Sequence, residues 1–502
     1  MSRKKFWFAA AGVPLLALGF FLQNLEPYRP AQVVSSEASC RMRVDAVEPI
    51  GGTPQGYAVL FHGVAANKRI MSYLAQDLAN QNLRVFAPDF PGHGGTPAPF
   101  WPMRASDCGE ALVSELISRH AIVPEMTILV GHSMGGAIAL RVSAKVPVAG
   151  VIAISPAPMR TGKLLSKEMV FFTDDPPLAK NSLLLTGSAE PLQLSEIARE
   201  KVNESNDPSN AYVQIPRASH VSILFDNDLL TEMRKWNKKI LGTDPDVIRA
   251  SHKPLYGFLC GMIGLILLTV PFIAEVTSGA CKNATDDAVS VSTTKILGQL
   301  LVSTALVVVI LKFWVPLKFL GIFQGDYLAS FALLLGLLLL VWNITEVKKA
   351  WRVSNKGIFG AVFGAVVLVL VFGLWFNYSF YEAFLNNAPR WARIVPMILA
   401  FFPWLLTEEI FLGGHNSMSR IRRVILTLAF RSIAWGALVA ALFLLHSGEV
   451  LMILLAAYFV LVTILQRLAM DVVRRETQSA PAAALFGAIL AAGFALAIFP
   501  LA

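Results

Sequence analysis

The sequence LVGHSMGGAIAL, residues 129–140, places Ser133 between two glycines, directly after a β-rich run and directly before a run of helix formers. A strand that turns sharply into a helix leaves no space for β-carbons beside the turn residue, which explains the glycines at positions 131 and 135. A Gly-x-Ser-x-Gly in an ordinary loop carries little information. The strand before this turn and the helix after it predict instead that Ser133 is an exposed nucleophile.

Short β-rich runs alternate with helix-like stretches on both sides of this turn. The β-rich runs are Tyr57–Phe61, Arg84–Ala87, Thr127–Val130, Gly150–Ile154, Ser182–Leu185 and Tyr212–Ile215. The helix-like stretches are Lys68–Asn80, Arg104–Arg119, Met134–Ala144 and Leu194–Glu204. This alternation predicts an α/β fold with a mostly parallel, doubly wound sheet. Ligands of such sheets bind at the carboxyl ends of the strands, so chemical motifs are expected there.

A serine nucleophile needs a base, and the base needs an orienting carboxylate. The run that ends at Leu185 is followed by Glu190, and the run that ends at Ile215 is followed by His220. We therefore predict that His220 is the base and that Glu190 is the acid. The alternative acids, none of which follows a strand so directly, are Asp174, Asp175 and Asp207.

The oxyanion that forms on the substrate carbonyl needs backbone N–H donors. The residue after the nucleophile, Met134, is expected to supply one of them. The turn after the earlier run AVLFHG is expected to supply the other, from Val64.

Five motifs give residues 44–242 a resemblance to the α/β-hydrolase superfamily. They are FHGVAANK (61–68), PDFPGHGGT (88–96), GHSMGG (131–136), TGSAE (186–190) and ASH (218–220). The resemblance implies the α/β-hydrolase fold, with Ser133 as nucleophile, His220 as base and Glu190 as acid. It also implies structural or pocket-lining roles for Asp89 and His93. Esterases, lipases, thioesterases and peptidases all occur in this superfamily, so the motifs do not choose a substrate.

The composition predicts a membrane protein, because 55% hydrophobic residues in a chain of 502 is too apolar for an ordinary soluble protein. Residues 1–24 have a basic start and the apolar run Phe6–Leu22, with no small-residue cleavage site after it, which predicts an uncleaved signal anchor. Residues 25–43 are expected to be a linker.

Residues 255–502 are predicted to form an all-α polytopic transmembrane domain with about eight spans. The candidate spans are Tyr256–Ile273, Ile296–Trp314, Tyr327–Ile344, Ile358–Phe376, Ile394–Leu412, Val424–Leu445, Val450–Leu465 and Ala482–Leu501.

The distribution of basic residues predicts the orientation of these spans. With the N-terminus in the cytoplasm, the inside loops carry Lys348, Lys349, Arg352, Lys356, Arg420, Arg422, Arg423, Arg467, Arg474 and Arg475. The short outside loops carry only Lys312, Lys318, Arg390 and Arg393. This bias places residues 25–250 on the extracytoplasmic side of the cell membrane, although a basic cluster at 234–253 lies on that side as well. We attribute most of the net charge of +9 to orientation and expect no nucleic-acid partner.

Two cysteines, Cys40 and Cys108, fall in the predicted extracytoplasmic segment, Cys260 lies in a span and Cys281 in an inside loop. An oxidising compartment allows a Cys40–Cys108 disulfide, and two unrelated buried thiols are an equal alternative.

The 26 residues from Pro156 to Asn181 stand where such enzymes insert a lid over the site. This short segment is apolar and contains Met159, Leu164, Leu165, Met169, Val170, Phe171 and Phe172. An apolar lid on a domain tied to a bilayer suits an acyl-lipid substrate, and packing of these residues on their own domain is an equal alternative.

The apolar half contains the stretches TEEIFLGG (407–414) and ALFLLH (441–446), with Arg431 between them. They resemble intramembrane proteases of the CAAX-processing type, which carry a Glu-Glu motif, a following Arg and later histidines. Gly413 stands where that Arg would be, and the next span lacks the further His or Asn. We therefore interpret Glu408 and Glu409 as interfacial residues, with His446 at the opposite boundary. No phosphate loop or metal-ligand cluster appears in the sequence, and no cofactor is expected.

Together these features predict a membrane-bound serine hydrolase that cleaves an acyl ester, with membrane lipids or lipid-like esters as partners. Peptide hydrolysis and acyl transfer through the same acyl-enzyme remain open, and the sequence indicates no protein partner. The alternative is a membrane transport or scaffold protein with an accessory or inactive hydrolase-like binding module.

Overall fold

The computed structural model describes most of the chain. The described residues are 3–26, 28–35, 40–161, 170–172, 174–244, 246–278, 292–313, 318–379, 381–382, 387–413, 419–446 and 448–502. They form two compact units, each of which is built from separate stretches of sequence. The sheet unit consists of Leu22–Tyr256, Phe376–Asn387 and Pro500–Ala502, and the helical unit consists of Met1–Phe21, Gly257–Trp375 and Ala388–Phe499.

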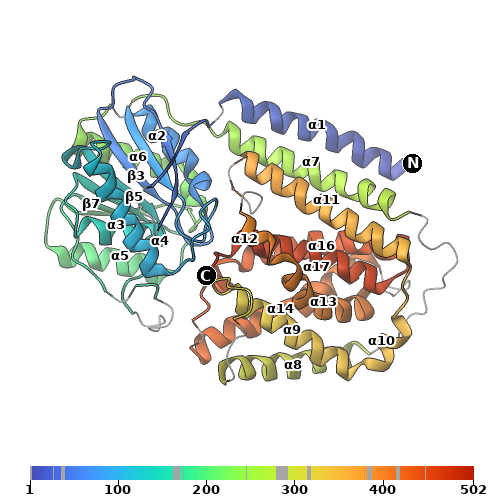
Figure 1. The fold of residues 1–502 in the computed structure, drawn as a ribbon. Coiled ribbons are helices and arrows are strands. Elements are labelled where there is room, and N and C mark those ends of the chain that lie inside the picture. Colours follow the sequence, from blue (N-terminus) through green and yellow to red (C-terminus); the bar gives the residue numbers. More distant parts are fainter. Residues whose placement is uncertain are drawn as a thin grey trace. The chain divides into compact units, whose positions relative to one another are not determined.

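The sheet unit is built on one eight-stranded sheet (Figure 1). Its strands are β1 (Ala31–Val34), β2 (Arg43–Val47), β3 (Gly56–Phe61), β4 (Leu83–Pro88), β5 (Thr127–His132), β6 (Gly150–Ile154), β7 (Ser182–Gly187) and β8 (Ala211–Ile215). The strand order is β1-β2-β4-β3-β5-β6-β7-β8. Strands β3 to β8 pair in parallel, as predicted, whereas β1 and β2 add an antiparallel edge.

The two edge strands were not expected from the sequence. Strand β1 lies inside the predicted linker 25–43, and all four of its residues are exposed. A strand without a buried face lacks the alternation of hydrophobic and polar residues from which a strand is predicted. The linker prediction therefore differs from the structure, in which the sheet already begins at Ala31.

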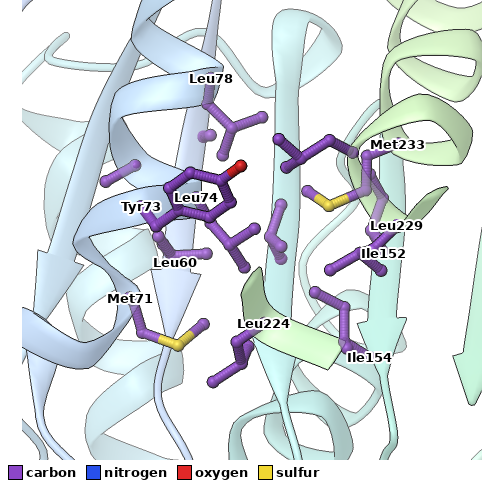
Figure 2. Packing of buried hydrophobic residues seen from close by; sticks show 14 of the residues in the cluster. Leu60, Met71, Tyr73, Leu74, Leu78, Ile152, Ile154, Leu224, Leu229 and Met233 are labelled. Carbon is purple, nitrogen blue, oxygen red and sulfur yellow. The ribbon is translucent and has the colours of Figure 1, made fainter. Parts of the chain in front are cut away.

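Helices pack on both faces of the sheet, as a doubly wound fold requires. They are α2 (Ser72–Asn80), α3 (Pro102–Ser118), α4 (Met134–Ser143), α5 (Leu192–Ser205) and α6 (Asn227–Leu241). Figure 2 shows the core on one face, where Leu74 and Leu78 of α2 and Leu229 of α6 meet strand residues such as Leu60 and Ile152. Burying an apolar side chain of this size contributes about 1.5–3 kcal/mol to the free energy of unfolding. This core holds the strand ends in place, and the site is built on those ends.

The structure joins Cys40, just before β2, to Cys108 of α3 in a disulfide across 68 residues of chain. Because the crosslink restricts the unfolded chain, we expect the double variant Cys40→Ser/Cys108→Ser to lose about 2–5 kcal/mol of unfolding free energy. Thermal unfolding of the full-length protein in detergent measures this loss, with Cys260→Ser, a change at a free cysteine, as the control. An unfolding temperature that the double substitution leaves unchanged would contradict the expectation.

The helical unit contains long apolar helices together with several short ones. Its elements are most of α1 (Arg3–Leu25) and α7 (Lys253–Val276), α8 (Thr293–Phe313), α9 (Gly325–Trp342), α10 (Ile344–Ala350), most of α11 (Asn355–Ser379), α12 (Ala388–Trp391), α13 (Ile394–Glu408), a π-helical turn (Glu409–Gly413), α14 (Arg420–Leu444), α15 (Leu451–Leu454), α16 (Ala456–Thr477) and α17 (Ala480–Ile498). Within this unit α1, α7 and α11 run side by side (Figure 1). Glycines permit the close approach, since a β-carbon at Gly19 would lie 2.7 Å from the backbone nitrogen of Gly261.

Eight helices among the described residues are long and apolar enough to cross a membrane. They comprise Phe6–Leu25, which corresponds to the predicted signal anchor, and seven helices after residue 252. The predicted span Val450–Leu465 is not one of these eight, because the chain there forms the short α15 and then α16, whose second half carries charged residues.

Candidate active site

Ser133 lies at the sharp turn between β5 and α4. Its backbone angles, φ 55° and ψ −120°, fall in a region that side-chain-bearing residues rarely adopt. The two flanking glycines are required for space: a β-carbon at Gly131 would lie 2.1 Å from the carbonyl oxygen of Gly135. A β-carbon at Gly135 would in turn lie 2.2 Å from the carbonyl oxygen of Phe61. The predicted turn therefore exists, with Ser133 at its apex.

The structure brings the three predicted catalytic side chains together. Nε2 of His220 lies 2.9 Å from Oγ of Ser133, and Nδ1 of His220 lies 3.0 Å from Oε2 of Glu190. The histidine follows β8 and the glutamate follows β7, so both side chains come from the carboxyl ends of neighbouring strands. In this arrangement His220 can take the hydroxyl proton of Ser133 while Glu190 stabilises the imidazolium that forms.

Two groups that the sequence did not indicate hold the Glu190 carboxylate. The backbone N–H of Gly187 donates to its Oε1 at 2.7 Å, and the hydroxyl of Ser155 donates to the same oxygen. The Glu190 side chain is fully buried. Its second oxygen is thereby left to face His220. The signal for Ser155 was its place at the end of β6, one residue beyond the predicted strand.

The alternative acids have other partners in the described part of the chain. Asp174 pairs with Arg141, whereas Asp175 pairs with Arg160 and Lys201. Asp207 accepts a hydrogen bond from the backbone N–H of Ser209 in its own loop. The geometry therefore favours Glu190 as the acid.

Both predicted oxyanion donors lie next to Ser133. Met134 is the first residue of α4, and a helix of this kind offers no internal acceptor to its first N–H groups. The turn after β3 passes beside the nucleophile, because a β-carbon at Gly63 would lie 3.1 Å from Cβ of Ser133. Val64 follows directly in that turn and is buried.

Two buried neutral histidines support the site. His132 donates from Nε2 to the backbone carbonyl of His220 at 2.7 Å, which holds the segment of the candidate base. His62 donates from Nδ1 to the carbonyl of Gly63 and accepts at Nε2 from the N–H of Phe90. Burial lowers the pKa of His62 to about 4 and that of His132 to about 3. The sequence places His62 in the motif FHGVAANK and His132 in the motif GHSMGG but indicates no separate role for either.

These lowered pKa values predict that the sheet unit loses stability in mild acid. An unfolded histidine takes up a proton near pH 6.5, whereas buried His62 and His132 take it up only near pH 4 and pH 3. Each histidine therefore removes about 1.4 kcal/mol of unfolding free energy per pH unit below 6.5, until its folded pKa is reached. Unfolding midpoints between pH 7.5 and 4.5 measure the slope, which His132→Gln should reduce. A midpoint that stays constant below pH 6.5 would contradict the expectation.

Asp89 and His93 have structural contacts, which is consistent with what the resemblance implies for them. Asp89 is fully buried and accepts hydrogen bonds from the backbone N–H groups of Lys68 and Gly95 and from the Lys68 amine. His93 donates from Nδ1 to the carbonyl of Pro91 and packs against Phe100. Neither contact involves Ser133.

Part of the predicted lid lies outside the described residues, including Leu164, Leu165 and Met169. Of the described part, Met159 and Phe172 are buried. A small, mostly apolar hollow lies at the carboxyl end of β6 and is lined by Leu140, Pro156, Ala157, Pro158, Met159, Asp175, Leu184, Leu194, Ile197, Ala198 and Lys201. Its wall is directly connected to the nucleophile, since the N–H of Ala157 donates to the carbonyl of Ser133 at 2.9 Å.

The glutamate pair of the helical unit differs from its sequence interpretation. Glu408 and Glu409 are fully buried rather than exposed at a boundary. Glu408 pairs with Arg431 of α14 at 2.7 Å, and Glu409 pairs with Arg467 of α16 at 2.7 Å. Paired charges avoid the cost of an isolated buried ion.

The same contacts correct the placement of two arginines. Arg467 and Arg474 were assigned to an inside loop, but both lie in α16 and are buried. The described contacts do not join His446 to the glutamates. Among the described residues, no group of three or more His, Cys, Asp or Glu side chains lies together as a metal site requires.

Part of the sheet unit matches a known protein family. Residues 58–201 match the family described as the alpha/beta hydrolase family. A lipase of Mycobacterium tuberculosis, LipV, is 32% identical over 114 residues, which are 22% of this chain and 41% of the relative. A monoglyceride lipase of Rattus norvegicus is 36% identical over 112 residues, which are 21% of this chain and 36% of the relative. The chain thus spans less than half the length of these curated relatives.

Two solved structures also match part of this chain. An alpha-beta serine hydrolase homologue from Coxiella burnetii matches 42% of this chain and 96% of its own, with 18% identity and a TM-score of 0.34. The monoacylglycerol lipase of Paleococcus ferrophilus matches 40% of this chain and 98% of its own, with 18% identity and a TM-score of 0.32.

Proposed function

Residues 58–201 match the alpha/beta hydrolase family, and from this premise we propose that the chain is a membrane-bound serine hydrolase that cleaves an acyl ester of a lipid or lipid-like molecule. The observation that carries the proposal is the line of contacts from Ser133 through His220 to Glu190, at 2.9 and 3.0 Å. The three residues also follow one another along the chain in the order serine, acid, histidine, which is the order of this fold.

The proposed reaction runs through an acyl-enzyme. Oγ of Ser133 attacks the ester carbonyl carbon while its proton passes to Nε2 of His220, and the N–H groups of Val64 and Met134 stabilise the oxyanion. His220 then gives the proton to the leaving alkoxide. Water attacks the acyl-enzyme and loses a proton to His220. Collapse of the second oxyanion releases the carboxylic acid and returns the proton to Ser133.

Three observations support an acyl-lipid as the substrate. The two curated relatives described above are lipases by name. The hollow at the carboxyl end of β6 is mostly apolar and begins at a residue that is hydrogen-bonded to Ser133. In the described part of the chain, eight helices are long and apolar enough to cross a bilayer, in which acyl esters are abundant.

The proposed location is the extracytoplasmic face of the cell membrane. Basic residues gather between and at the ends of candidate spans, at positions that this topology places inside, namely Lys348, Lys349, Arg352, Arg420, Arg422 and Arg423. The Cys40–Cys108 disulfide supports the same side, because disulfides persist in oxidising compartments. Protease digestion of intact cells tests the side: cleavage within residues 25–250 is expected, and their protection would contradict the topology.

A panel of substrates tests the function. Purified full-length protein in detergent is expected to hydrolyse monoacylglycerols and long-chain nitrophenyl esters faster than acetyl esters or peptides. Ser133→Ala should lose this hydrolysis. Ser118→Ala is its matched control, because the hydroxyl of this exposed serine at the end of α3 donates to the carbonyl of Glu115 in the same helix. Failure to hydrolyse any ester would contradict the proposal and favour the alternative of an inactive binding module.

A further inference from the structure

The turn that carries the candidate oxyanion donor is held by residues from much later in the chain. Residues 62–68 follow β3, contain Val64 and pass beside Ser133. The segment Phe376–Asn387, which includes the last residues of α11 and ends just before α12, belongs to the sheet unit. Its described residues Tyr381 and Glu382 contact the turn directly.

Three hydrogen bonds join this segment to the turn. The hydroxyl of Tyr381 donates to the carbonyl of Ala65 at 2.9 Å. The side-chain amide of Asn67 donates to the backbone carbonyl of Glu382 at 3.1 Å. The amine of Lys68 donates to Oε2 of Glu382 at 2.5 Å.

The conformation of Ala65 explains why such support is needed. Ala65 has a φ of 57°, in the left-handed region that disfavours residues with a β-carbon. Strain of this kind persists only where surrounding contacts fix the backbone. The Tyr381 hydroxyl binds the strained residue itself, next to Val64. A turn released from this contact would relax and move the N–H of Val64 away from the oxyanion.

Glu382 helps to compensate the buried positive charge of Lys68. Burial alone would lower the pKa of this amine, but the carboxylates of Asp89, Glu382 and Asp45 outweigh burial and raise the pKa. Lys68 is therefore a buried cation at the end of the turn, with a relative exposure of 1%. Removing one carboxylate from a buried ion pair leaves the cation undercompensated, and the cation then shifts toward solvent or another partner.

We propose that Tyr381 and Glu382 are positioning residues for the oxyanion turn, residues 62–68, and thereby support the active site of the sheet unit. This inference rests on the proposed function for its catalytic consequence. The contact with the turn itself can be tested without catalysis.

The test uses full-length protein with Tyr381→Phe, Glu382→Gln and the two changes combined. We expect kcat for a lipid ester to fall about 10- to 100-fold, as a misplacement near 1 Å does, with KM nearly unchanged. The Ki of a boronic acid, whose tetrahedral adduct places an oxygen in the oxyanion site, should rise in parallel. Backbone amides of residues 62–68 should exchange hydrogen faster than in the wild type.

The matched control is Asp77→Asn, which weakens another buried ion pair of the sheet unit. Asp77 pairs with Arg234 at 2.6 Å, and each side chain has a relative exposure of 2%. This variant should lower the unfolding temperature while leaving kcat and the exchange of residues 62–68 as in the wild type.

Each outcome bears on the proposal in a different way. The inference would be overturned if the backbone amides of residues 62–68 exchanged hydrogen in the combined variant at the same rate as in the wild type. It would also be overturned if Asp77→Asn lost as much kcat as the combined variant. Tyr381→Phe removes only the hydroxyl that donates to Ala65. If Glu382→Gln folds poorly, this variant alone still tests the inference. Faster exchange in a protein whose wild type hydrolyses no ester would support the held turn and contradict the proposed function instead.

Discussion

Ser133→Ala is expected to abolish ester hydrolysis, with a fall in kcat of about 10⁶-fold. The substitution removes the hydroxyl that lies 2.9 Å from Nε2 of His220, and no other described group occupies that position. Alanine keeps the β-carbon, so the strained backbone at φ 55° is left as it is. Folding should be unaffected, and KM should change little, because ester binding does not use the hydroxyl.

Steady-state hydrolysis of a long-chain ester measures the loss, with protein concentration and unfolding temperature determined in parallel. Ser118→Ala is the control and should match the wild type in both. Activity in Ser133→Ala above about one hundredth of the wild-type value would contradict the role of Ser133, since serine and base act as one unit.

Glu190→Gln should lower kcat by about 10⁴-fold through the wrong tautomer of His220. The N–H of Gly187 and the hydroxyl of Ser155 both donate to Oε1, so the glutamine carbonyl must occupy that place. The glutamine amide then donates to Nδ1 of His220. The histidine proton moves to Nε2, where the ring can no longer accept the proton of Ser133.

Asp207→Asn is the matched control, because Asp207 is one of the alternative acids and accepts its hydrogen bond from Ser209 in its own loop instead. It should leave kcat within about twofold, because a change away from the site costs little. The reverse result, a large loss in Asp207→Asn with near-normal activity in Glu190→Gln, would reassign the acid.

The candidate catalytic residues could be predicted because each follows a strand whose β-rich run is contiguous in the sequence. Parallel strands bring their carboxyl ends to one edge, so Ser133, Glu190 and His220 had to lie near one another. The same local reasoning failed for Ser155 and His132, whose roles depend on which neighbour their polar atoms reach. Sequence spacing carries no information on such contacts.

Features built from distant segments could not be predicted. Tyr381 is 316 residues from its partner Ala65, and nothing in its own surroundings marks it as part of the sheet unit. The burial of Glu408 was missed for the same reason, since its partner Arg431 lies on another helix. Strand β1 was missed because it buries no side chain.

The most direct test of the central claim is covalent labelling with a fluorophosphonate, followed by mapping of the adduct by mass spectrometry. The full-length protein in native membranes should form one adduct, on the peptide that contains Ser133. Labelling should disappear in Ser133→Ala and slow strongly in Glu190→Gln. A folded protein that forms no adduct, or an adduct that survives Ser133→Ala, would contradict the account.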